Sequence, residues 1–197
     1  MGLTNSKSGE YWYGILGVKS RERNIILRRL AKKGKLVAVG IDELPGQIFF
    51  IRQADLNILE SVCNSNRPKP GAAFIAALDN LTWNRSLIKT IFDFEYVWEV
   101  YKPKSQRKYG YYVLPVICGD RFVARFEPAF DKKKKIFTIQ NWWWEKDVHP
   151  DAGMQEALRV CLKDFLLYLD ADKFNLGSPI RQNLSLTWSH DALNSND

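Results

Sequence analysis

The spacing of apolar residues in the first part of the chain predicts helices that alternate with short strands. Ile26 and Leu30 lie four residues apart, which puts both side chains on one face of a helix, and Gly34 is a typical helix stop. We expect a short first helix with Tyr11, Ile15 and Leu16 as its apolar positions. A second helix is expected over 20–33, capped by Ser20, with Ile25, Ile26 and Leu30 on its apolar face. Strands over 35–39 and 47–51 and a helix over 55–62 should follow. This order, with the loop 40–46 as the wing, predicts a winged helix.

The remaining chain shows the pattern of a small mixed domain. Residues 64–71 have the composition of a linker. After it we expect, in order, a buried strand over 73–78, a helix over 85–92 capped by Asn84, strands near 95–102, 110–118, 121–128 and 134–140, and an amphipathic helix over 152–170. The fold class is therefore α+β: a winged helix in residues 1–66, an α+β domain with an antiparallel, barrel-like sheet in residues 67–175, and a partly disordered tail in residues 176–197.

Three consecutive tryptophans, Trp142, Trp143 and Trp144, fall in the last expected strand. Because side chains alternate between the faces of a strand, we expect Trp142 and Trp144 on one face and Trp143 on the other. Structural packing is the favoured interpretation of this run, with at most one ring available to a ligand.

The segment from Tyr101 to Pro128 carries most of the candidate chemistry. Gly119-Asp120 suits a hairpin turn between two strands rich in Val, Ile and Phe. Four cations and three tyrosines precede the first strand: Lys102, Lys104, Arg107, Lys108, Tyr109, Tyr111 and Tyr112. Such a surface can hold a phosphate backbone and stack on bases, although a solvated basic loop fits the same residues. Strand alternation predicts that Arg107 to Tyr109 lie at the exposed end and that Tyr112 is mainly buried.

The charge is positive and unevenly distributed. The net charge is +7; residues 1–60 hold ten Lys or Arg against six acids, residues 61–150 fifteen against nine, and residues 151–197 four against seven. This asymmetry favours a polyanionic partner or an anionic membrane. We expect no membrane association, since no apolar run approaches the ~20 residues of a span. Three widely spaced cysteines and the lack of a leader pattern predict a cytoplasmic protein.

The helix over 20–33 is the candidate DNA reader, because eight cations and a single acid lie between residues 19 and 35. A solvated basic face and a protein-binding winged helix are the alternatives. The candidate DNA-binding residues are Lys19, Arg21, Arg23, Arg28 and Lys32 on this helix, Lys102, Lys104, Arg107, Lys108 and Tyr109 before the hairpin, and Lys132 and Lys133 in the charged run that follows Asp131.

Several ordered motifs resemble a known family. Arg107-Lys-Tyr-Gly-Tyr-Tyr-Val-Leu-Pro115, then Gly119-Asp-Arg121 and Arg125, and upstream Leu78-Asp-Asn-Leu-Thr-Trp-Asn-Arg85 with Phe92-Asp-Phe-Glu-Tyr96 and Glu99-Val-Tyr101, are similar to the winged-helix DNA glycosylases of the AlkZ-like and YcaQ-like family. The resemblance covers roughly residues 15 to 170. It implies DNA repair, in which alkylated bases are removed or interstrand crosslinks unhooked, and a chain that corresponds to the C-terminal half of such an enzyme.

The resemblance also implies that the family's catalytic motif, Gln–hydrophobic–Gln or Gln–hydrophobic–Asp, has no counterpart here. Gln53-Ala-Asp55 has a similar order of residues, but it follows the second wing strand, and Asp55 is expected to cap the next helix. The two histidines lie far apart, and neither a zinc-binding spacing nor a phosphate-binding glycine motif is present, so we expect no metal or cofactor. We therefore expect a protein that binds double-stranded DNA and is inactive alone. Catalysis would need an N-terminal half that is lost by truncation, encoded separately as a partner, or absent by evolution. The alternatives are a winged-helix transcription regulator and a protein-interaction module.

Overall fold

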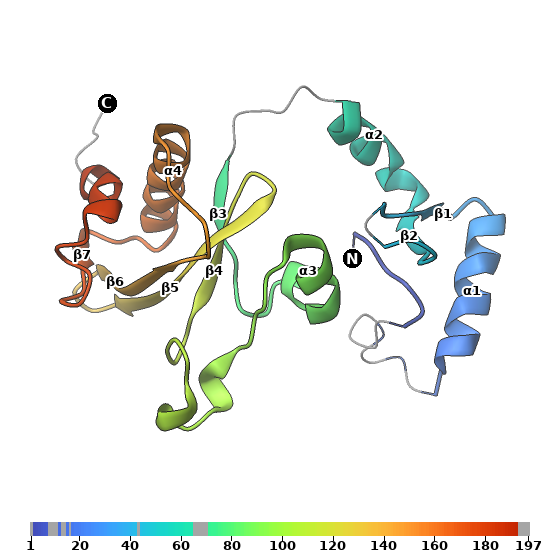
Figure 1. The fold of residues 1–197 in the computed structure, drawn as a ribbon, viewed down its shortest axis with the longest axis horizontal. Helices are drawn as coiled ribbons and strands as arrows, with labels where there is room; N and C mark the ends of the chain where they lie inside the picture. Colours follow the sequence, from blue (N-terminus) through green and yellow to red (C-terminus); the bar gives the residue numbers. More distant parts are fainter. Residues whose placement is uncertain are drawn as a thin grey trace. The chain divides into compact units, whose positions relative to one another are not determined.

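The computed structural model describes residues 2–7, 12, 15, 17–42, 44–64 and 71–192. The chain divides into two compact units, one made of Met1–Pro68 with Asn80–Glu95 and the other of Lys69–Asp79 with Tyr96–Asp197. Each unit combines helices with a sheet, as the ribbon shows (Figure 1). The chain therefore has the mixed α+β character that its sequence predicts. No helix in the described ranges is long and apolar enough to cross a membrane.

The first unit is built around a two-stranded antiparallel sheet. Its elements, in order, are α1 (Ser20–Lys32), β1 (Leu36–Val39), β2 (Phe49–Arg52), a 3-10 turn (Gln53–Asp55), α2 (Leu56–Asn64) and α3 (Arg85–Phe92). The register pairs Leu36 with Arg52 and Val39 with Phe49, which confirms the expected hairpin. Gly34, at a φ of 66°, lets the chain leave α1 through the left-handed region. The expected helix around Tyr11 and Leu16 falls mainly outside the described residues.

Two expectations for α1 are wrong. Ser20 is the first helical residue and not the cap; the cap position belongs to Lys19, whose backbone N–H donates to the Glu22 carboxylate at 2.7 Å. The buried position is Leu27, whereas Ile25 and Ile26 are 52% and 39% exposed. At about 100° per residue, Leu27 lies on a different side of the helix from both isoleucines. The side of α1 that packs against β1 is therefore set by Leu27 and not by the isoleucine pair.

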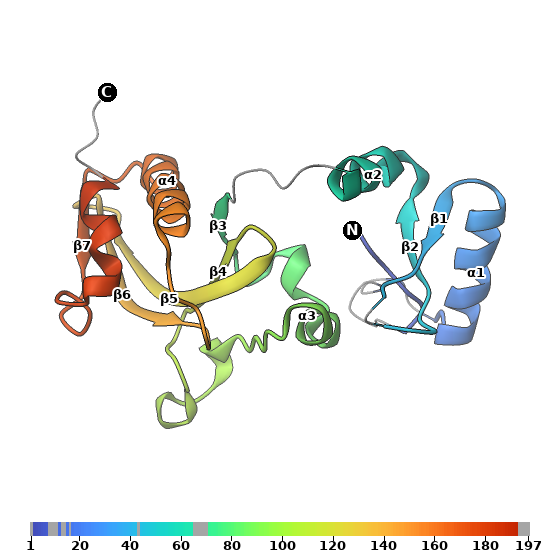
Figure 2. The ribbon, with the colours of Figure 1, turned by 45° about the horizontal axis from the view of Figure 1, so that its top comes forward.

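The second unit holds a five-stranded sheet in the order β3 (Ala72–Phe74), β4 (Leu114–Cys118), β5 (Arg121–Asp131), β6 (Ile136–Trp144) and β7 (Lys173–Leu176). Neighbours from β3 to β6 pair antiparallel, and β7 pairs parallel with β6. The sheet curls into a half-barrel (Figure 2). Register shifts after Val116 and Glu127 interrupt the ladders of β4–β5 and β5–β6. Such bulges increase local bending and twist.

The helix α4 (Ala152–Tyr168) packs against the sheet through its apolar stripe. Leu158, Leu162 and Leu166, spaced four residues apart, are at most 2% exposed. Asp151 caps the helix by accepting from the backbone N–H of Met154 at 2.7 Å. The expected helix over 152–170 is thus confirmed to within two residues at its C-terminal end.

The tryptophan run lies in β6 as expected. Trp142 is 5% exposed, and its ring meets the Trp144 ring edge-on at a centroid distance of 5.2 Å. Trp143 lies on the other face, against Tyr109. The packing interpretation of the three rings is confirmed.

Four parts of the second unit differ from expectation. The buried strand expected over 73–78 is the shorter β3, which ends at Phe74 and whose residues are half-buried or exposed. No strand forms at 95–102, where Glu99–Tyr101 is a 3-10 turn, and a second 3-10 turn, Lys104–Gln106, follows. The strand expected from residue 110 begins only at Leu114. The strand β7 was not expected, and the 3-10 segment Leu184–Ala192 after it places Leu186 and Trp188 in the core. Residues 193–197, the end of the expected tail, lie outside the described residues.

Candidate nucleic-acid interface

The segment of residues 98–112, here called the basic–aromatic loop, is held from one side by Glu99. The side chain of Glu99 is only 4% exposed, and its two oxygens accept hydrogen bonds from the backbone N–H groups of Lys108 and Tyr109 at 3.1 and 2.9 Å. The ammonium group of Lys102 lies 2.9 Å from the same carboxylate. Burial alone raises the pKa of a carboxyl, but these hydrogen bonds and the Lys102 charge lower the pKa of Glu99 to about 2. Glu99 is therefore ionised throughout the physiological range.

Glu127 holds the other end of the loop. Its Oε1 accepts from the backbone N–H of Tyr111 at 2.8 Å, and its Oε2 accepts from the amide of Asn141 at 3.0 Å. Gly110 lies against this carboxylate so closely that an added Cβ would meet it at 2.5–2.7 Å. The two carboxylates thus occupy backbone N–H groups of residues 108, 109 and 111, which explains why the chain forms a loop and not a strand here.

Tyr109 is packed and not free to stack on a ligand. Its ring meets Trp143 edge-on at 5.4 Å, and the guanidinium of Arg125 lies 4.3 Å from its centroid. Arg125 is itself buried, with Nε 2.6 Å from Oε1 of Glu145. Arg125 and Tyr109 therefore join the loop to the sheet.

The side chain of Arg107 lies along the loop surface. Its Nε donates to the backbone carbonyl of Lys102 at 2.9 Å, and its guanidinium lies 4.8 Å from the centroid of the Tyr111 ring. These contacts leave Arg107 half-buried, while Lys104 and Lys108 are exposed. Lys102 is drawn inward by Glu99, so Lys104, Arg107 and Lys108 provide most of the accessible charge.

The expected burial of Tyr112 is wrong. Tyr112 is 39% exposed, and its ring meets Trp98 edge-on at a centroid distance of 6.3 Å. Strand alternation does not apply to Tyr112 because β4 begins two residues later. The buried position that follows the loop is Val113, whose carbonyl accepts from the hydroxyl of Tyr96 at 2.9 Å.

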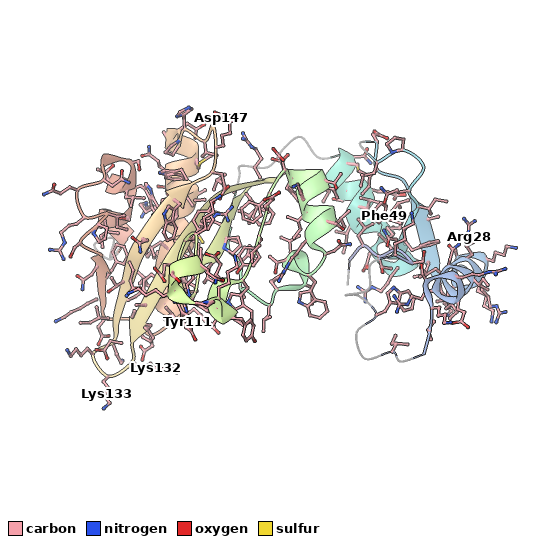
Figure 3. The ribbon with its side chains drawn as sticks, turned by 60° about the horizontal axis from the view of Figure 1, so that its bottom comes forward. Arg28, Phe49, Tyr111, Lys132, Lys133 and Asp147 are labelled. Carbon is pink, nitrogen blue, oxygen red and sulfur yellow. The ribbon has the colours of Figure 1, made fainter. Side chains whose placement is uncertain are left out.

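The cations of α1 divide into two groups. Arg21, Arg28 and Lys32 lie within about 40° of one another around the helix axis, and all three are exposed. Figure 3 shows Arg28 extending from the helix. Arg23, in contrast, donates from Nε to the carbonyl of Val18 at 2.8 Å, and its guanidinium lies 5.3 Å from the Trp12 ring centroid. Lys19 is exposed at the cap position.

The charged run after Asp131 forms the turn between β5 and β6. Oδ1 of Asp131 accepts from the backbone N–H groups of Lys133 and Lys134, which shapes the turn. Lys132 and Lys133 are exposed at its tip (Figure 3). Lys135 is instead engaged with Asp170 at 2.7 Å. The expected site residues therefore lie on three surfaces: α1 in the first unit, and the basic–aromatic loop and this turn in the second.

Sequence reasoning missed the residues that hold the loop in place. Glu99, Glu127 and Glu145 were not among the expected site residues, although each is an acid within an otherwise apolar or aromatic stretch. A charged residue in such a stretch needs a partner when it is buried, so the pattern was a usable signal. Within the described ranges, no group of three or more His, Cys, Asp or Glu could hold a metal ion.

The carboxylate of Asp55, in the Gln53-Ala-Asp55 tripeptide, accepts two hydrogen bonds from the guanidinium of Arg52, at 2.6 and 2.7 Å. Its pKa is lowered, chiefly by this hydrogen bonding. The cap role expected for Asp55 is thus replaced by an ion pair with the strand that precedes it.

Comparison with known protein families gives the class of the protein, a DNA-repair protein related to the DNA glycosylases. The model of the family described as DNA glycosylase AlkZ-like matches residues 1–168. Because this match covers most of the chain, the chain belongs to the AlkZ-like DNA glycosylase family. Membership makes DNA the expected substrate. No solved structure matches the chain with significance.

Proposed function

We propose that this chain binds double-stranded DNA through the exposed face of α1 and through the cations Lys104, Arg107 and Lys108 of the basic–aromatic loop, which contact phosphates. The observation that carries the proposal is the cluster of Arg21, Arg28 and Lys32 on one solvent-facing stripe of α1. None of the three forms an ion pair with another described residue. Cations that are not neutralised within the protein are the groups that can replace counterions along a phosphate backbone.

The arrangement of the first unit supports a winged helix within the domain proposed for residues 1–66. In that arrangement α1 is the helix that enters the major groove, and the β1–β2 hairpin is the wing. Arg21 lies near the N-terminal end of α1, from which such helices contact base edges. In this proposal, α1 and the β1–β2 hairpin make the contacts of the first unit with DNA.

For catalysis, we propose that the chain supplies DNA binding to an excision reaction whose catalytic glutamine motif lies on a separate N-terminal half. Asp55 supports this assignment, since a carboxylate held by Arg52 is poorly placed to position a water at a flipped nucleotide. The purified chain should then show no single-turnover release of an alkylated base and no unhooking of a crosslink. Release of base by the chain alone would contradict the proposal.

The binding proposal is tested by titrating a short duplex with the protein over a range of salt concentrations. If about four to six phosphates are neutralised, the slope of log K against log salt should be roughly −4 to −5. A flat response would reject DNA binding and favour a protein-interaction module. Equal affinity for crosslinked and undamaged duplex, together with a preferred sequence, would favour a transcription regulator.

A further inference from the structure

Three tyrosine rings of the basic–aromatic loop face solvent. Tyr101 is 85% exposed, Tyr111 53% and Tyr112 39%. Large apolar rings at such exposures, gathered in one short segment, are a feature of recognition surfaces and not of a loop that only connects two strands. Together these three rings are called the tyrosine platform below.

Each ring of the platform contacts a neighbouring side chain. Trp98 meets Tyr101 edge-on at 5.5 Å and Tyr112 edge-on at 6.3 Å. Arg107 donates to the carbonyl of Lys102, the residue after Tyr101, and its guanidinium lies over the ring of Tyr111. Trp98 therefore holds two of the rings, and Arg107 holds the third.

The platform lies on a backbone that is already fixed. Glu99 and Glu127 hold the N–H groups on both sides of Gly110, and Tyr109 is packed against Trp143. A ligand that stacks on the exposed rings would not have to order this part of the loop, so less of the binding free energy is lost to conformational entropy.

The charges around the rings favour a nucleic acid over an apolar protein partner. Lys104, Arg107 and Lys108 lie in the same segment, and its acid, Glu99, is buried and neutralised. Cations that lie beside exposed rings can contact the phosphates of a single strand while the rings stack on its bases. A protein-binding surface would more often be depleted of lysine.

From these contacts we infer that the tyrosine platform stacks on unpaired nucleobases, so that the protein prefers DNA with extrahelical or single-stranded nucleotides over fully paired duplex. Within a duplex, base faces are covered by their neighbours and only edges are accessible in the grooves. Stacking on protein rings therefore requires bases that have left the helix. The inference rests on the proposed DNA binding and adds the structural state of the DNA that the loop recognises.

The test compares a short duplex with the same duplex carrying a central gap of unpaired thymidines, using fluorescence anisotropy and the full chain. The double variant Tyr101→Leu/Tyr111→Leu removes two rings that have little part in the core. The matched control is Tyr101→Phe/Tyr111→Phe, which keeps the rings and removes only the hydroxyls. Circular dichroism checks that both variants fold.

We expect the wild type to prefer the gapped DNA by roughly 5- to 150-fold, the range for stacking on one base. The leucine variant should lose this preference and bind intact duplex as the wild type does, whereas the phenylalanine variant should keep it. The salt slope of the leucine variant should not change, because stacking releases no counterions.

Equal wild-type affinity for the two DNAs, or a preference that survives in the leucine variant, would overturn the inference while leaving DNA binding intact. Failure of both DNAs to bind would overturn the proposed function together with the inference. The platform would then be a candidate protein-binding surface.

Discussion

The carboxylate of Glu99 and the backbone N–H of Tyr109 are joined by a 2.9 Å hydrogen bond that spans ten residues of chain. Both residues belong to the sequence motifs that resemble the family, yet neither is placed to meet a ligand: Glu99 is buried, and Tyr109 is packed between Arg125 and Trp143. These two residues of the motifs therefore maintain the shape of the basic–aromatic loop. Contacts with a ligand would come from other residues of the loop.

Replacement of Glu99 by glutamine should make stability less dependent on acid pH. The pKa of Glu99 is about 2 in the folded protein, against an ordinary value of 4.5. A lowered folded pKa stabilises the protein above the unfolded pKa, and this stabilisation is lost as the pH falls from about 4.5 to about 2. The pKa difference corresponds to a stabilisation of the folded protein by about 3 kcal/mol at neutral pH.

Chemical denaturation of the wild type and Glu99→Gln at a series of pH values measures this effect. The free energy of unfolding should differ most above pH 4.5, and the difference should narrow toward pH 2. Glu156→Gln is the matched control, because Glu156 also pairs with a cation, Arg159, but its side chain is 59% exposed. A Glu99→Gln difference that stays constant across this pH range would show that the charge of Glu99 has no stabilising role.

Replacement by alanine should lower the stability of the protein by different amounts at Gly110 and at Gly177. A Cβ on Gly110 would meet the carboxylate of Glu127, a side chain that can move away at the cost of its bonds to Tyr111 and Asn141. A Cβ on Gly177 would meet the backbone of Gln140 at 2.6–2.9 Å, which cannot move without disturbing β6.

We therefore expect Gly110→Ala to lower the free energy of unfolding by about 1–2 kcal/mol and Gly177→Ala by about 2–3 kcal/mol. Thermal or urea denaturation gives the order of the two losses. Amide exchange at Tyr111 should accelerate only in Gly110→Ala, since only that change displaces Glu127. The reverse order of stability would mean that Glu127 is held more rigidly than the sheet backbone.

Local patterns in the sequence predicted the regular elements well. The hairpin of β1 and β2, the capping of α3 by Asn84, whose side chain accepts from Leu87 at 3.0 Å, and the turn at Gly119, with a φ of 61°, all follow from nearby residues. Each is decided by contacts within a few positions of chain, which is the range that residue spacing and turn chemistry report.

The errors arose where a distant partner decided the outcome. Strand propensity favoured a strand across Tyr111 and Tyr112, but Glu99 and Glu127 bind the backbone N–H groups that a neighbouring strand would need. Likewise, β7 pairs with β6, from which it is separated by the whole of α4. A run as short as residues 173–176 does not by itself predict that pairing.

On α1, Arg28→Ala should weaken duplex binding with little effect on stability. Arg28 is exposed, and its one described side-chain hydrogen bond runs from Nε to Asn24 at 3.3 Å on the same helix. Loss of one phosphate contact should lower the magnitude of the salt slope by about one. Lys146→Ala is the matched control, because this cation is 92% exposed but lies outside the three surfaces that hold the expected site residues. Equal effects of the two variants would indicate that only net charge matters.

The contribution of Arg107 to DNA affinity should depend on the planar shape of its side chain as well as on its charge. Its Nε bond to the Lys102 carbonyl and its position over the Tyr111 ring both need the planar guanidinium, which an ammonium group does not reproduce. Arg107→Ala should lower DNA affinity by about 1–2 kcal/mol, the scale of a charge-assisted contact.

Arg107→Lys keeps the charge, so it separates the two roles of Arg107. If the arginine acts mainly on phosphate, the lysine variant should bind intact duplex almost as the wild type does, with the same salt slope. If it also supports Tyr111, the lysine variant should lose affinity for gapped DNA more than for intact duplex. Anisotropy titrations of both variants on both DNAs measure these differences. Wild-type affinity of Arg107→Ala for both DNAs would show that Arg107, like Glu99 and Tyr109, serves the shape of the loop and touches no ligand.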